Sequence, residues 1–81
     1  MNEAEIRAVY LEELSGVAPD IDPDTVGDNE HIQDDLELDS MDILNLVTAL
    51  HARTGVDIPE KDYPCIATVA LAVEYLRTNL K

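Results

Sequence analysis

The sequence predicts an all-α fold, a four-helix bundle with three main helices, one short helix and a long first loop. Apolar residues recur at helical spacing in three segments, and no run alternates with period two for long enough to predict a strand. The chain has no Phe or Trp, so its core must come from Leu, Val, Ile, Ala and three Tyr, which suits helices better than a sheet. Its 81 residues fit one small domain, 1–81, with a modest core.

The first helix is predicted over residues 2–16. Asn2 can cap it, and Glu5 stands three residues later, as in a capping box. Gly16 is the expected stop, and Pro19 prevents the helix from continuing. The stripe that should face the core consists of Ile6, Val9, Tyr10, Leu14 and Val17.

A long connection follows over residues 17–39. Pro19, Pro23 and Gly27 interrupt any helix there. A loop this long is unusual in a compact domain, so we expect it to be functional or tied to the core. The apolar residues that can tie it down are Ile21, Val26, Ile32, Leu36 and Leu38.

The remaining helices occupy the second half of the chain. Residues 40–54 are predicted to form the second helix, and residues 60–64 a short turn of helix between Pro59 and Pro64. The last helix is predicted over residues 69–80. Thr68 is its expected cap, and its core stripe contains Val69, Ala72, Val73, Leu76 and Leu80.

The charge balance limits the classes of partner. Five Lys and Arg against eighteen Asp and Glu give a net charge of −13, which argues against nucleic acid and anionic membranes. A basic protein partner is the natural complement, although such acidity also serves solubility alone. No stretch approaches the roughly 20 apolar residues of a membrane span, so we expect no membrane insertion. The single cysteine, Cys65, fits a reducing cytoplasm; we expect it to be a small core residue and the protein to be a monomer.

Ten of the eighteen acidic residues lie between Asp20 and Asp42 without an intervening Lys or Arg. Asp20 could open an EF-hand loop, but that register puts Thr25 where Gly is required and His31 where Glu is required. The sequence therefore predicts no metal site of this kind.

At the end of this loop, Asp39 is placed to cap the second helix, with Asp42 three residues later. Ser40 then occupies the first helical position with its hydroxyl free to face solvent. A phosphate on that hydroxyl would lie at a helix N-terminus, which favours anions. The alternative is that Ser40 is itself the cap and nothing more.

The second helix has two different apolar faces. Winding it at 100° per residue gathers Ile43, Leu46, Val47 and Leu50 into a core stripe. Met41, Leu44, Thr48 and Ala52 fall on another face, next to Ser40. A small apolar strip beside an acidic rim favours a docking surface, although scattered exposed apolar residues are also normal.

Three segments together resemble the acyl carrier proteins. Asp39-Ser40-Met41 resembles the family's Asp-Ser-Leu element, in which the serine takes the phosphopantetheine arm. Ile58-Pro59-Glu60 resembles the segment before the family's short third helix, and Ile66-Ala67-Thr68-Val69 resembles the start of its last helix. The spacing between the segments matches without gaps, and the resemblance covers essentially the whole chain.

The sequence departs from the fatty-acid type in two regions. Glu37 stands where the family usually has glycine, so the turn before the serine is open to change, and Met41 replaces a leucine. The glutamate-rich ridge of the second helix is absent here, since the corresponding positions are Asn45, His51, Ala52 and Arg53. A specialised carrier is therefore at least as well supported as a generic fatty-acid one.

The resemblance implies an acyl-carrier-like four-helix bundle, and it implies a carrier and not an enzyme. Ser40 would take 4′-phosphopantetheine from a phosphopantetheinyl transferase, and the thiol of the arm, not that of Cys65, would hold the cargo as a thioester. Further partners would be acyl-transferring or cargo-loading synthase enzymes. The second apolar face and its acidic rim give the expected partner-binding residues, which are Asp39, Met41, Asp42, Leu44 and Thr48. The resemblance implies that an acyl chain would be lined by Val47, Ile58, Tyr63 and Ile66.

Two other functions remain open at this point. A discrete amino-acyl or peptidyl carrier would share the arm but differ in cargo. A cofactor-free acidic module would bind a basic protein and take no arm. A Ser-His-Asp hydrolase is excluded, because the sequence has no Gly-x-Ser-x-Gly elbow.

Overall fold

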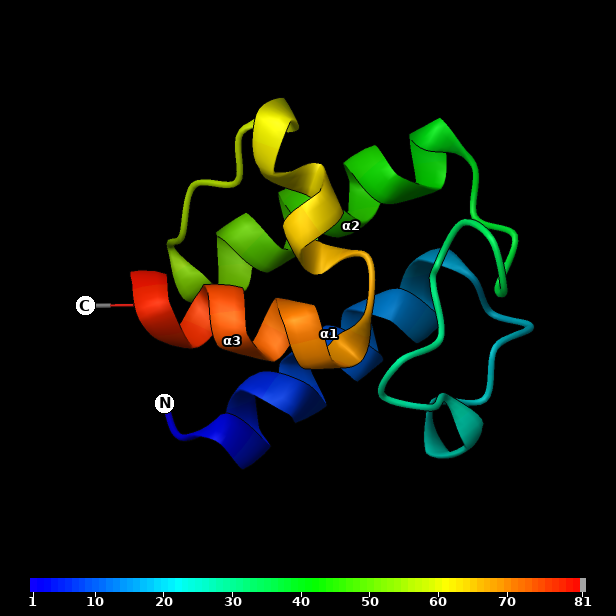
Figure 1. The fold of residues 1–81 in the computed structure, drawn as a ribbon, viewed down its shortest axis with the longest axis horizontal. Coiled ribbons are helices and arrows are strands. Elements are labelled where there is room, and N and C mark those ends of the chain that lie inside the picture. The colour runs from blue at the N-terminus through cyan, green and yellow to red at the C-terminus, as the bar shows by residue number, and fades with distance from the viewer. Residues whose placement is uncertain (81) are drawn as a thin grey trace.

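The computed structural model describes residues 1–80, which form three α-helices and two short 3₁₀ helices (Figure 1). No strand occurs among these residues, so the predicted all-α class is confirmed. No helix in this part of the chain is long and apolar enough to cross a membrane. In chain order the elements are α1 (Glu3–Val17), η1 (Pro23–Thr25), α2 (Ser40–Thr54), η2 (Glu60–Ile66) and α3 (Val69–Asn79).

Helix α1 begins as predicted and ends later than predicted. The side chain of Asn2 accepts a hydrogen bond from the Glu5 amide at 2.8 Å, and the Glu5 carboxylate accepts one from the Asn2 amide at 3.2 Å. The prediction that Gly16 ends the helix is wrong, because the helix includes Val17 and is capped by Ala18. Glycine tolerates helical geometry at a cost of about 1 kcal/mol, whereas a residue that precedes proline is driven out of it, as Ala18 is by Pro19.

The short helix η2 is longer than the predicted turn over residues 60–64. It runs through Pro64 to Ile66, and the Ala67 amide still donates to the Pro64 carbonyl at 3.3 Å. Proline is tolerated here because its fixed φ of about −65° suits a 3₁₀ helix. Helix α3 begins at the predicted cap, Thr68, which accepts from the Leu71 amide at 3.1 Å, and it ends at Asn79. Lys81, at the end of the predicted single domain, lies outside the described residues.

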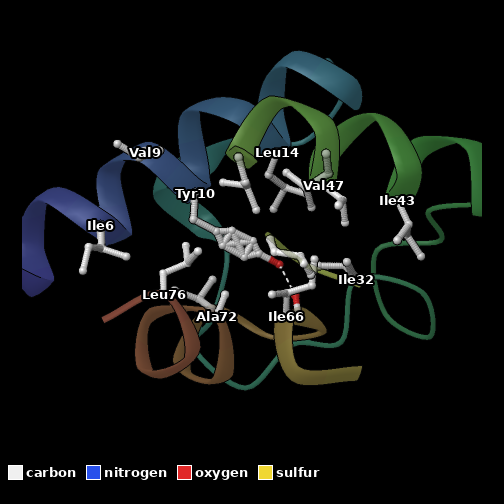
Figure 2. Close-up of a cluster of buried hydrophobic side chains, with 14 of the residues drawn as sticks. Ile6, Val9, Tyr10, Leu14, Ile32, Ile43, Val47, Ile66, Ala72 and Leu76 are labelled. Carbon is white, nitrogen blue, oxygen red and sulfur yellow. Dashed lines mark hydrogen bonds between the residues drawn. The ribbon is translucent and has the colours of Figure 1, made fainter. Parts of the chain in front are cut away.

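The core lies where α1 packs against both α2 and α3, with Tyr10 at its centre (Figure 2). The Tyr10 hydroxyl donates a hydrogen bond to the Ile66 carbonyl at 2.6 Å, which joins α1 to η2 inside the core. Burial of this phenol raises the pKa of Tyr10 well above its ordinary value. The core face predicted for α2 is confirmed, since all four of its residues are buried: Ile43, Leu46, Val47 and Leu50.

The long loop closes the end of the bundle opposite the two termini (Figure 1). Its predicted anchors Val26, Ile32 and Leu38 are buried, while Ile21 and Leu36 are half-buried. Backbone hydrogen bonds hold it as well. The Ile32 amide donates to the Ala67 carbonyl and the Leu38 amide to the Ile32 carbonyl, both at 2.9 Å. The loop is therefore tied to the core both by its apolar side chains and by its backbone.

Polar contacts at the surface also join α2 to α1 and α3 to η2. Arg53 on α2 contacts the carboxylates of Glu12 and Glu13 on α1 at 2.7 and 3.1 Å. Tyr75 on α3 donates to the Asp62 carboxylate of η2 at 2.8 Å; burial and this hydrogen bond raise the pKa of Tyr75 to about 12. The expectation that Cys65 lies in the core is wrong, because η2 turns its side chain outward and places the next residue, Ile66, in the core.

We predict that Tyr10→Phe lowers the free energy of unfolding by about 1–3 kcal/mol, because the Ile66 carbonyl would be left buried without its donor. Urea unfolding measures this loss. Tyr63→Phe is the matched control: Tyr63 is half-buried and no hydrogen bond of its hydroxyl is found within residues 1–80, so its removal should change stability little.

The same variant should also change the alkaline pH dependence. Tyrosine ionises near its ordinary pKa of 10.0 in the unfolded chain, whereas buried Tyr10 keeps its proton. The unfolded state then binds fewer protons above pH ~10, so stability falls as pH rises, by at most about 1.4 kcal/mol per pH unit for one group. This slope should be smaller in Tyr10→Phe; an unchanged slope would show that Tyr10 ionises in the folded protein.

Candidate functional site

The start of α2 leaves Ser40 without a structural task. The Asp39 carboxylate accepts a hydrogen bond from the Asp42 amide at 2.8 Å, and the Asp42 carboxylate accepts one from the Asp39 amide at 3.5 Å. This reciprocal pair is a capping box, so Asp39, and not Ser40, is the cap. Ser40 is the first helical residue and is exposed. Its hydroxyl therefore faces solvent at the positive end of the helix.

The turn just before α2 contains Glu37, which has a φ of 61°. It is the only non-glycine residue with a positive φ in residues 1–80. The left-handed conformation costs a residue with a side chain roughly 1–2 kcal/mol. Glu37 therefore adopts the left-handed conformation that glycine adopts more easily, at a cost in stability. The turn is kept, and Leu38 still reaches the core.

A second turn, at His31, lies earlier in the loop. The His31 Nδ1 accepts hydrogen bonds from the amides of Gln33 at 3.1 Å and Asp34 at 3.3 Å. The His31 amide donates to the Asp35 carboxylate at 2.8 Å. Because Nδ1 accepts, the proton of the neutral ring is on Nε2. His31 thus takes the role that Ser or Asn usually plays in such a turn, and it keeps one ring N–H free for another contact.

A cavity of about 230 Å³ lies beside Ser40, where the long loop, α2 and η2 meet. Of the four residues predicted to line an acyl chain, Tyr63 lines this cavity. Val47, Ile58 and Ile66 are instead buried in the core. Most of the lining of this cavity comes from residues that the sequence did not single out for such a role, because the loop contributes to it and the position of the loop is set by tertiary contacts. The lining consists of His31, Ile32, Gln33, Ser40, Ile43, Glu60, Tyr63, Pro64 and Ala67.

The predicted docking strip is exposed on α2. Met41 is 63% exposed and Leu44 is 45% exposed, although residues of this kind are usually buried. Thr48, farther along the same face, donates its hydroxyl to the Leu44 carbonyl at 2.9 Å and thus binds within its own helix. At the start of the strip, Asp39 is exposed and Asp42 is half-buried. The strip therefore has two apolar side chains between an acidic end and a polar end.

The C-terminal end of α2 does not present a row of acidic side chains. Arg53 is held by two glutamates of α1, and this contact raises the pKa of its guanidinium. The exposed His51 ring has its Nδ1 at 3.1 Å from the Val56 carbonyl and 3.3 Å from the Asp57 carboxylate. The negative charge next to Ser40 therefore comes from the helix start and the loop. Within residues 1–80, no group of three or more His, Cys, Asp or Glu side chains is arranged to hold a metal ion.

Comparison with known proteins places the fold and the site in a family context. A family model described as a phosphopantetheine attachment site matches residues 10–76. The acyl carrier protein of Wolinella succinogenes is 33% identical over 75 residues, which are 93% of this chain and 92% of that protein. The acyl carrier protein of Zymomonas mobilis is 38% identical over 71 residues, or 88% and 85% of the two chains. A solved structure of the Enterococcus faecalis acyl carrier protein matches with a TM-score of 0.76 and 32% identity, covering 98% of this chain and 99% of that one.

We predict that Glu37→Gly raises the free energy of unfolding by about 1 kcal/mol, because glycine adopts a φ of 61° without the steric cost of a side chain. Urea unfolding compares it with Glu37→Ala, which removes the same charge but keeps the backbone strain. Equal stability of the Gly and Ala variants would show that the turn is not strained.

Proposed function

The chain belongs to the family of acyl carriers that have a phosphopantetheine attachment site, and from this premise we propose that Ser40 is the residue that bears the arm. A member of this family is a carrier and not an enzyme: it holds an acyl group for other proteins to act on. Membership also argues against the cofactor-free acidic module that the sequence alone left open.

The observation that supports Ser40 is its free, exposed hydroxyl at the first position of α2. The neighbouring Asp39 and Asp42 carboxylates are occupied by backbone amides of the capping box, so neither depends on Ser40. A phosphodiester on this hydroxyl would lie at the N-terminus of a helix, where the unpaired amides and the helix dipole favour an anion. The residues present therefore fit the group.

The role of the chain is to hold and present this group. When bound, the arm supplies a thiol that carries the cargo as a thioester. Ser40 provides the point of attachment, and the capping box of Asp39 and Asp42 fixes the start of the helix on which it stands. The pinned loop keeps the attachment point at one end of the bundle, away from both termini (Figure 1).

The partners that we propose are a phosphopantetheinyl transferase and the enzymes that load or remove the cargo. Met41 and Leu44 are the apolar anchors for these partners, and Asp39 and Asp42 supply charge for basic residues on them. Thr48 extends the same face. We propose further that residues 1–81 form a single carrier domain, that it acts as a monomer and that it works in the cytoplasm, where an exposed thiol such as that of Cys65 stays reduced.

The pathway that we propose is a specialised one. The far end of α2 offers partners little negative charge, since Arg53 is paired with glutamates of α1 and His51 contacts the backbone. An enzyme that depends on an acidic ridge along this helix would find little to bind there. A discrete amino-acyl or peptidyl carrier is the second candidate, and loading by an adenylating enzyme would identify it.

We predict that Ser40→Ala abolishes attachment of the arm and leaves the helical fold intact, because Ser40 makes no contribution to the capping box. The protein is incubated with a phosphopantetheinyl transferase and coenzyme A, and intact mass and circular dichroism are recorded. Ser15→Ala is the matched control, since Ser15 and Ser40 are the only serines of the chain. Arm addition to the Ser40→Ala variant would refute the assignment.

We predict that Leu44→Ala slows arm transfer while costing much less stability than the ~2–5 kcal/mol of a buried Leu→Ala change, because Leu44 is 45% exposed. Urea unfolding and transferase kinetics are measured together. Leu71→Ala is the control, because Leu71 is similarly exposed at 49% but lies on α3. A large loss of stability with unchanged kinetics would mean that Leu44 serves the core and not a partner.

A further inference from the structure

The turn at His31 depends on a ring nitrogen that carries no proton. The His31 Nδ1 accepts hydrogen bonds from the Gln33 amide at 3.1 Å and from the Asp34 amide at 3.3 Å. A neutral imidazole has one acceptor nitrogen, whereas a protonated ring has two donors and no acceptor. Protonation would therefore set a ring N–H group against two amide N–H groups, and both hydrogen bonds of the turn would be lost together.

The charges on the loop favour the proton that the turn excludes. The Asp34 carboxylate lies 3.9 Å from the His31 Nδ1. The Asp35 carboxylate accepts a hydrogen bond from the His31 amide at 2.8 Å. A carboxylate close to an imidazole stabilises its protonated form. Charge and hydrogen bonding therefore act on this ring in opposite directions.

The elements that pack against the turn add negative charge and no positive charge to the cavity that His31 lines. Glu60 of η2 lines this cavity, and Asp39 and Asp42 of the capping box flank Ser40, which lines it from α2. Among the described residues that line the cavity there is no Lys or Arg. The remaining lining residues of α2 and η2 are uncharged at neutral pH: Ser40, Ile43, Tyr63 and Pro64.

A protonated ring has a partner within reach. The Asp34 side chain is 83% exposed, so its carboxylate can reorient without disturbing the core. A small rotation would bring the His31 Nδ1–H to this carboxylate and away from the Gln33 and Asp34 amides. The two arrangements compete for one nitrogen, and its proton decides which of them forms.

The turn forms part of the wall beside Ser40. The side chains of His31 and Gln33 line the cavity that Ser40 also lines. Ile32, between them, is held separately, because its side chain is buried and its amide donates to the Ala67 carbonyl at 2.9 Å. Opening of the turn would therefore move the polar side chains of this wall and leave the anchor in the core.

We propose that the turn at His31 is a pH-sensitive device. With the ring neutral, the turn is closed by the hydrogen bonds from the Gln33 and Asp34 amides; with the ring protonated, it opens as the Nδ1–H group moves to the Asp34 carboxylate. Opening rearranges the wall next to Ser40 and makes that end of the protein a poorer substrate for arm transfer. The second half of this proposal rests on the proposed attachment at Ser40, and the first half does not.

The opening is measured by NMR on the full chain without an arm, from about pH 8 to about pH 5.5, the range in which histidine ordinarily gains its proton. At the upper end, the ring ¹⁵N signals of His31 should show the proton on Nε2. As the ring is protonated, the amide proton signals of Gln33 and Asp34 should move to lower frequency with the same midpoint, while that of Ile32 moves little. Amide signals that stay in place while the ring is protonated would overturn the proposal, as would a ring that stays neutral throughout.

The variant His31→Asn separates the ring from the carboxylates around it. The asparagine side-chain oxygen accepts from amides two and three residues along the chain, but it does not titrate. The Gln33 and Asp34 amide signals should then be independent of pH over the same range, whereas His51→Asn should behave as the unaltered protein does. Signals that still move in His31→Asn would show that carboxylates drive the change, and the proposal falls. If His31→Asn does not fold, agreement or disagreement of the ring and amide midpoints in the unaltered protein decides alone.

The effect on Ser40 is tested by competition. The unaltered protein and His31→Asn share one reaction with a phosphopantetheinyl transferase and coenzyme A, so that the pH dependence of the enzyme cancels in the ratio of the two products. Intact mass measures this ratio, which should fall several-fold from the upper to the lower end of the pH range. A constant ratio would overturn the effect on arm transfer. If neither protein gains an arm, the proposed function fails, while the amide titration, which needs no arm, still tests the turn.

Discussion

One constraint governs this structure: the acidic loop between α1 and α2 must be pinned to a core that contains no Phe or Trp. The negative charges of the loop repel one another and favour an expanded conformation. Few apolar side chains are available to hold the loop against this repulsion. The molecule meets the constraint with three buried anchors, Val26, Ile32 and Leu38, and with backbone hydrogen bonds from Ile32 to Ala67 and from Leu38 to Ile32. The bond from Ile32 ties the loop to the end of η2, which the Tyr10 hydroxyl in turn holds against α1.

The site follows from that pinning. Once Leu38 is buried, the next residue, Asp39, stands at the start of α2 and closes the capping box with Asp42. Ser40 is thereby left exposed with a free hydroxyl, and the loop turn at His31 forms one wall of the adjoining cavity. Ser40, the exposed apolar strip of Met41 and Leu44 and the cavity thus lie at one end of α2, whose start the loop positions.

Sequence reasoning succeeded where the determinants are local. The bounds of α2 were predicted from the cap at Asp39 and the apolar spacing, and Gly55 ends the helix in the left-handed conformation that suits glycine. It failed where tertiary placement decides. Pro64 was expected to end η2, yet a 3₁₀ helix accommodates it, and Cys65 was expected in the core. The contribution of His31 to the cavity could not be predicted, since it depends on how the loop folds back against α2 and η2.

We propose that this loop and capping box present Ser40, and no other residue, as the attachment point. The most direct measurement is fragmentation mass spectrometry of the protein after incubation with a phosphopantetheinyl transferase and coenzyme A, which locates the added group on individual residues. We expect one arm per chain, borne by the Ser40 hydroxyl, with Ser15 and Cys65 unmodified. An arm found at either of those residues, or a chain that takes none, would contradict it.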